Sequence, residues 1–178
     1  MRSAARDAMM IANVDAYAGD NRERSVFRMV TAALRAQPKA YIRADFPPQF
    51  LQEDRLALSH VHTEVRRQVK NVRHLVRNHA LTGVVLGHSH MVLLVIPILD
   101  VYARELWKYL MGASAVLSDG QVDAALARAP QLKAWFAYIR LATMANHFDL
   151  AARSISHWDQ IDGQLQANRP RSENWNNA

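Results

Sequence analysis

The chain has 178 residues, no cysteine and a formal net charge of +6. Its length suits one domain around one hydrophobic core, and 50% of its residues are apolar against 21% charged, which excludes an intrinsically disordered chain. The lack of cysteine excludes disulfides, thiolate metal sites and cysteine-based catalysis.

The charge balance of the chain is strongly basic. Lys and Arg number 22 against 16 acidic residues, and the isoelectric point is near 10.1. A positive field of this kind attracts polyanions such as nucleic acid or anionic lipid. The apolar run near the first residues is too short for a signal peptide, so we expect an intracellular, cytoplasmic protein.

Helix-forming residues dominate the segments between the Pro and Gly residues, and no segment alternates apolar and polar residues as a half-buried strand does. We therefore predict an all-α fold with no sheet of more than two strands. The fold is expected to be a single-domain helical bundle of about six helices over residues 1–166. The predicted helices cover residues 3–17, 22–36, 49–80, 89–112, 121–128 and 131–157. Residues 167–178 lack apolar periodicity and are predicted to be an extended polar tail.

The clearest pattern lies between Leu58 and His79, where apolar and basic residues follow helical spacing. At 100° per residue the apolar set falls within an arc of about 80°, and four cations fall within an adjacent arc of about 60°. The apolar set is Leu58, Val61, Val65, Val69, Val72 and Val76. The cations are Arg66, Lys70, Arg73 and Arg77, which we call the cation row.

The cation row is predicted to bind a polyanion. Like charges four residues apart on a helix repel each other, so a group of opposite charge should offset the repulsion. Phosphates are one such group, because Arg offers a planar fork for them and each neutralised phosphate releases counterions. Carboxylates of a protein partner are a second, and a fully solvated face is a third.

A long apolar run covers residues 81–99 and could cross a bilayer by its length alone. The run contains His88, Ser89, His90 and Pro97, which lipid penalises unless another segment covers them. We therefore predict a central helix of a soluble bundle, with a membrane span as the alternative.

Inside this run, Gly87-His88-Ser89-His90-Met91 resembles the nucleophile elbow of the α/β-hydrolase family, in which Gly-x-Ser-x-Gly follows an apolar strand. The resemblance implies Ser89 as a nucleophile. It departs from the motif at Met91, where the elbow needs a small residue, and the chain lacks the strand and helix alternation of that fold.

Two further patterns have the outline of a functional site. His60 and His62, like His88 and His90, are two residues apart, a spacing that suits metal ligands on a strand but not on a helix. We expect no metal site, no cofactor and no catalytic residue. Residues 121–140 have the outline of a helix-turn-helix unit, but the aromatic residues of the second helix favour packing.

These patterns predict a non-enzymatic structural or accessory component of a larger assembly, which binds nucleic acid or another polyanion through the cation row. We also expect the protein to bind protein partners or to self-assemble. A membrane-associated subunit anchored through residues 81–99 is the alternative, and a hydrolase that uses Ser89 comes third.

Overall fold

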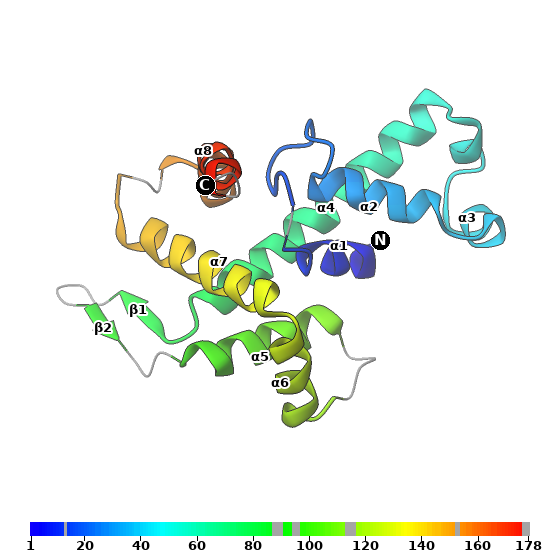
Figure 1. Cartoon of the computed structure of the whole chain (residues 1–178). Helices are drawn as coiled ribbons and strands as arrows, with labels where there is room; N and C mark the ends of the chain where they lie inside the picture. The colour runs from blue at the N-terminus through cyan, green and yellow to red at the C-terminus, as the bar shows by residue number, and fades with distance from the viewer. Residues whose placement is uncertain (13, 87–90, 94–96, 113–116, 152–153, 176–178) are drawn as a thin grey trace. The chain divides into compact units, whose positions relative to one another are not determined.

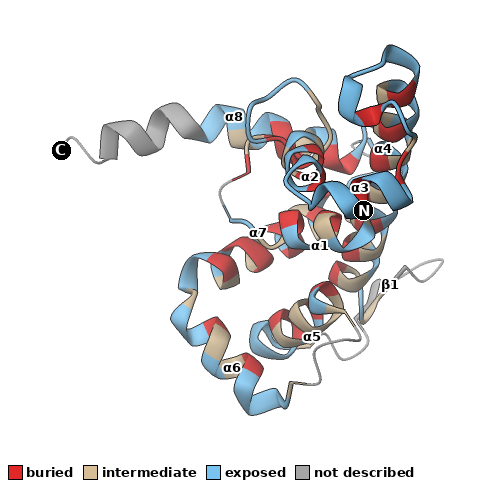
Figure 2. Cartoon of the chain, turned by 90° about the vertical axis from the view of Figure 1, so that its right-hand side faces the viewer, coloured by how far each residue is buried: buried red, intermediate tan, exposed pale blue. Residues whose placement is uncertain are grey.

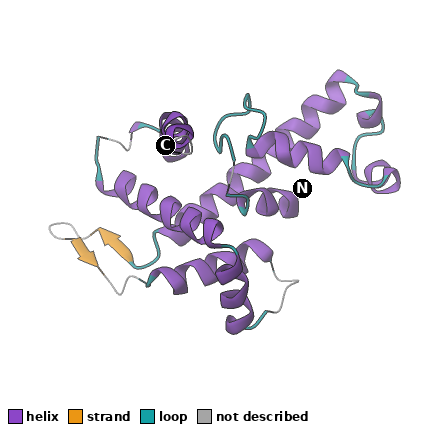
Figure 3. Ribbon diagram, in the orientation of Figure 1, coloured by secondary structure: helices purple, strands orange, loops and turns teal. Residues whose placement is uncertain are grey.

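The computed structural model describes residues 1–12, 14–86, 91–93, 97–112, 117–151 and 154–175. The predicted all-α class is confirmed (Figure 3). Within the described residues the chain forms eight α-helices rather than about six, and its one sheet has two strands. No helix among those residues has the length and hydropathy required to cross a lipid bilayer.

The helices and strands follow one another along the chain as Figure 1 shows. In the first half they are α1 (Arg2–Met9), α2 (Val26–Arg35), α3 (Lys39–Asp45), the 3-10 helix η1 (Phe50–Gln52) and α4 (Arg55–Ala80). They continue with β1 (Val84–Leu86), β2 (Met91–Leu93), α5 (Leu99–Met111), α6 (Asp119–Arg128), α7 (Pro130–Phe148) and α8 (His157–Trp175).

The chain divides into two compact units. The first unit combines residues 1–72 with 162–178, and the second comprises residues 73–161. Buried positions recur along the helices of both units as red bands between pale blue exposed ones (Figure 2).

In the first unit, α1 packs against α2. The Ser25 side chain caps α2 by accepting a hydrogen bond from the backbone N–H of Arg28, and the apolar side of the helix buries Val26, Val30 and Leu34. The predicted helix 3–17 ends early, at Met9, because residues 15 and 16 pair in extended form with residues 24–26.

Another long-range contact of the first unit joins the loop after α1 to α8. The carboxylate of Asp162 is 6% exposed and accepts three backbone hydrogen bonds. The donors are the N–H groups of Tyr17 at 2.6 Å, Ala18 at 2.9 Å and Gly19 at 3.0 Å. This loop therefore depends on a side chain about 145 residues away for its hydrogen bonds.

In the second unit, α5 packs against α6 and α7, which also contact each other (Figure 1). Ser118 and Gln121 form a capping box at the start of α6, and Pro130 occupies the first turn of α7, where its missing N–H costs nothing. The core between these helices includes Leu106, Leu126 and Phe136, all at most 4% exposed.

The predicted helix over residues 89–112 is wrong in its first part, and so is the central-helix interpretation of residues 81–99. Val84–Leu86 and Met91–Leu93 form an antiparallel pair in which Val85 faces Val92 in register, and α5 begins only at Leu99. Gly83 has φ 80°, a left-handed conformation that ends the helical path after α4. The β-branched valines that follow favour a strand, which an apolar run without periodicity does not distinguish from a buried helix.

The C-terminal end also differs from the prediction. Residues 167–175 belong to α8 rather than to an extended tail, while residues 176–178 lie outside the described residues. The predicted helix 131–157 is broken after Phe148, since the Asp149 side chain accepts a hydrogen bond from the N–H of Ala151 and stabilises a turn. Low apolar periodicity therefore did not prevent a helix at the end of the chain.

Candidate nucleic-acid interface on α4

The valine stripe of α4 is buried as predicted. Val61, Val65, Val69, Val72 and Val76 are at most 5% exposed, and Leu58 is half-buried. Because these side chains fix one face of the helix against the core, the rotation of α4 about its own axis is determined. The cations beside the stripe therefore have a defined direction.

All four members of the cation row lie on α4. Arg66 and Lys70 are exposed, and Arg73 and Arg77 are half-buried. The first two belong to the first unit and the last two to the second. At a rise of about 1.5 Å per residue, the positions from Arg66 to Arg77 correspond to about 16 Å of α-helix.

Arg66 has contacts that the sequence pattern does not reveal. Its Nε donates to Asp20 Oδ2 at 2.7 Å, and its guanidinium lies 4.7 Å above the Phe27 ring. The same ring meets His62 edge-on at 5.3 Å. Burial lowers the pKa of His62, and the nearby charges of Arg66 and Arg35 lower it further, so this histidine adds no cation to the row at neutral pH.

The acidic residues near the row are few, and they already accept hydrogen bonds from arginines of α4. Glu64 accepts hydrogen bonds from Arg67 at 2.8 and 2.7 Å, and these bonds lower the pKa of Glu64 to about 2. No acidic residue occurs in α4 after Glu64. Within the described residues, Lys70 and Arg77 form no ion pair. The row therefore keeps cationic groups that can meet an external anion.

Among the described residues, the other side chains singled out in the sequence do not gather into a site. His88, Ser89 and His90 lie outside the described residues, so the nucleophile-elbow motif has no described geometry. In the part of the chain that the structure describes, no three metal-ligating side chains form a cluster. In the helix-turn-helix outline, Phe136 on the second helix is fully buried, as packing requires.

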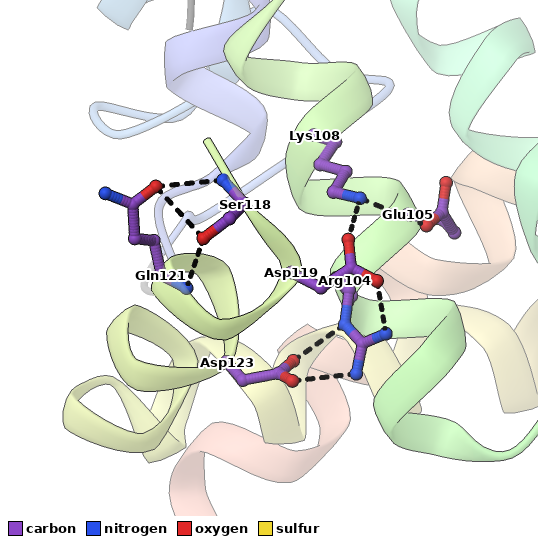
Figure 4. A network of polar contacts seen from close by, with 7 residues as sticks. All are labelled: Arg104, Glu105, Lys108, Ser118, Asp119, Gln121 and Asp123. Atoms are coloured by element: carbon purple, nitrogen blue, oxygen red, sulfur yellow. Dashed lines mark hydrogen bonds and ion pairs between the residues drawn. The ribbon is translucent and has the colours of Figure 1, made fainter. Parts of the chain in front are cut away.

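A network of charged groups joins α5 to α6 in the second unit (Figure 4). Arg104 donates two hydrogen bonds to Asp123, at 2.8 and 2.7 Å, and one to Asp119 at 3.0 Å. Lys108 also pairs with Asp119. Asp100 lies four residues before Arg104 on the same helix, but it pairs with Lys133 instead. These charged groups are paired with one another, so we interpret the network as a contribution to the packing of α5 against α6 rather than as a binding site.

This network gives a first testable expectation. Arg104→Lys keeps the charge but loses the planar fork that holds Asp123, so we expect Tm to fall by a few degrees. Arg128→Lys, at an exposed arginine of α6, is the matched control and should leave Tm unchanged. Equal Tm values for both variants in a calorimetric scan would show that the fork adds nothing to stability.

Comparison with known proteins gives no family: no family model, no curated protein and no solved structure matches the chain.

Proposed function

We propose that this protein is a non-enzymatic accessory component of a larger assembly and binds nucleic acid through the cation row Arg66, Lys70, Arg73 and Arg77. The observation that carries the proposal is the buried valine stripe, at most 5% exposed, next to a row that has no acidic residue on its own helix after Glu64. A helix held in this way presents its cations in a fixed direction.

The dimensions of the row support phosphate as its ligand. Four cations spread over about 16 Å of helix, and one strand of duplex DNA rises about 3.4 Å per phosphate, so each cation can meet a separate phosphate. Contacts of this kind release counterions and carry no base information. The proposed binding is therefore strong at low salt and tolerant of sequence.

The cation row is tested by changing all four of its residues to Gln, a good helix former. We expect the variant to retain its helical circular dichroism and to bind labelled duplex DNA at least about tenfold more weakly at low salt. The slope of log affinity against log salt should fall by up to about 0.9 per lost phosphate contact. Fluorescence anisotropy at several salt concentrations measures both quantities.

A control variant with the same loss of charge distinguishes an effect of the cation row from an effect of net charge. It replaces four exposed arginines outside the row with Gln: Arg24, Arg43, Arg55 and Arg128. We expect this control to lose less affinity than the row variant. Equal losses in the two variants, or a wild type that binds no nucleic acid even at low salt, would refute the proposal.

A further inference from the structure

Two arginines from different helices of the first unit converge on Asp20, in the loop before α2. Arg66 of α4 donates from Nε to Asp20 Oδ2 at 2.7 Å. Arg28 of α2 donates from Nε to the backbone carbonyl oxygen of Asp20 at 3.2 Å. Because both hydrogen bonds end on one residue, the two guanidinium groups are neighbours. Arg28 does not belong to the cation row, which the spacing along α4 defines.

Both arginines keep the outer ends of their guanidinium groups for an external partner. The hydrogen bonds to Asp20 use only Nε, and within the described residues neither arginine donates from Nη1 or Nη2. Arg28 is exposed, and the side chain of Arg66 is 54% exposed. A ligand in solution can therefore approach both arginines. The paired nitrogens of a guanidinium group bind two oxygens of one phosphate.

Helix α2 fixes the position of Arg28 and supports Arg66. Val26 and Val30 are fully buried, so the rotation of α2 about its own axis is determined. Phe27, the residue before Arg28, places its ring 4.7 Å from the guanidinium of Arg66. The face of an aromatic ring attracts a cation in this position. The two arginines are therefore ordered before a ligand binds, which reduces the entropy that binding costs.

The charges around the two arginines favour an anion despite the carboxylate of Asp20. One carboxylate lies beside two guanidinium groups, so the cluster keeps an excess of positive charge. Within the described residues that carboxylate pairs with Arg66, and Arg28 forms no ion pair. Lys70, one turn after Arg66 on α4, is exposed and adds to the positive field.

We propose that Arg28 and Arg66 form a clamp for one backbone phosphate of a bound nucleic acid, which extends the interface from α4 onto α2. This inference rests on the proposed binding of nucleic acid by the cation row. Arg66 belongs to both the clamp and the row, so the clamp lies where the row begins. Two guanidinium groups that share one phosphate hold it more tightly than a single cation does.

The clamp is tested by Arg28→Gln, which removes one guanidinium group and introduces a good helix former. We expect the variant to retain its helical circular dichroism, because an exposed hydrogen bond adds little to stability. It should bind labelled duplex DNA about three- to tenfold more weakly at low salt, as measured by fluorescence anisotropy. Arg43→Gln, at an exposed arginine of α3, is the matched control and should lose at most about twofold.

A double variant tests whether the two arginines share one phosphate. Each phosphate contact contributes up to about 0.9 to the slope of log affinity against log salt. If the phosphate is shared, Arg28→Gln and Arg66→Gln together should lower the slope by about 0.9, because either arginine alone still holds the phosphate. Two independent contacts would lower the slope by about 1.8, and that result would contradict the clamp.

Arg28→Lys separates the geometry of the guanidinium group from its charge. Lysine keeps the cation but lacks the planar group that binds two phosphate oxygens. We expect the DNA affinity of this variant to lie between those of the wild type and Arg28→Gln. An affinity equal to that of the wild type would mean that charge alone is required, against the clamp. If Arg28→Gln does not fold, this comparison decides by itself.

The variant of the whole cation row distinguishes a failure of the clamp from a failure of the proposed function. If the row variant loses DNA affinity and Arg28→Gln does not, the nucleic acid binds along α4 alone and the clamp is wrong. If the wild type binds no DNA even at low salt, the proposed function and the clamp are both wrong.

Discussion

Replacing Asp162 with Ala is expected to lower the free energy of unfolding by about 3 to 5 kcal/mol. The carboxylate accepts hydrogen bonds from the N–H groups of Tyr17, Ala18 and Gly19, and it is 6% exposed. Removing it leaves three backbone donors without an acceptor, at least one of them fully buried. Urea denaturation followed by circular dichroism measures the loss.

A neighbouring acid on the same helix provides the control for Asp162. Asp159 is exposed, so Asp159→Ala changes the net charge equally and should cost little. Asp162→Asn keeps one carbonyl oxygen and should fall between the wild type and Asp162→Ala. Equal stability of the two Ala variants would mean that water replaces the carboxylate at no cost.

The sequence predicted those features that depend on residues close together in the chain. The helical spacing of Val61, Val65, Val69, Val72 and Val76 identified the buried face of α4, because a helix places residues three and four apart on one side. The direction of the cation row follows from the same spacing. The all-α class follows from helix propensity summed over long segments.

Contacts between distant segments could not be predicted in this way. The pairing of Asp162 with residues 17–19, and of Arg66 with Asp20, joins residues far apart in the chain, and no local pattern marks either pair. The strands β1 and β2 were missed for a different reason. A strand and a buried helix can both have an unbroken apolar run as their sequence, and only pairing with another segment distinguishes them.

The burial of Arg140 has a signal in the sequence. It is the sole charged residue between Lys133 and His147, within a helix that is otherwise apolar on most sides. A lone charge in such a helix must either reach solvent or be buried, and the buried case requires a partner. The absence of an acid three or four residues away indicated that this partner would come from outside α7.

The free energy of unfolding is expected to fall as the pH drops from about 6.5 to about 4, with His157 as the main cause. His157 is 6% exposed, and burial followed by the positive charge of Arg77 lowers its pKa to about 4. Thr143 donates its hydroxyl proton to the Ile139 carbonyl at 2.7 Å, so its oxygen accepts from His157 Nε2 at 2.8 Å. The second ring nitrogen, Nδ1, is buried without a partner among the described residues, so a proton there would lack an acceptor.

The sign follows from the two states of the imidazole. Above about pH 6.5 the ring is neutral in both the folded and the unfolded chain, and it contributes no pH dependence. Between about 6.5 and 4 the unfolded chain binds a proton that the folded chain does not, which favours unfolding. The full shift corresponds to about 3 kcal/mol, which is the upper bound of the expected loss.

Urea denaturation at about pH 7.5, 6 and 4.5 tests this dependence. His157→Gln keeps a donor for Thr143 but cannot bind the proton, so the variant should lose less stability than the wild type over the same range. The lowered pKa values of His62 and His79 act in the same direction and account for a residual slope. His60→Gln, at an exposed histidine, should keep the wild-type profile. A His157→Gln profile parallel to that of the wild type would assign the pH dependence to other groups.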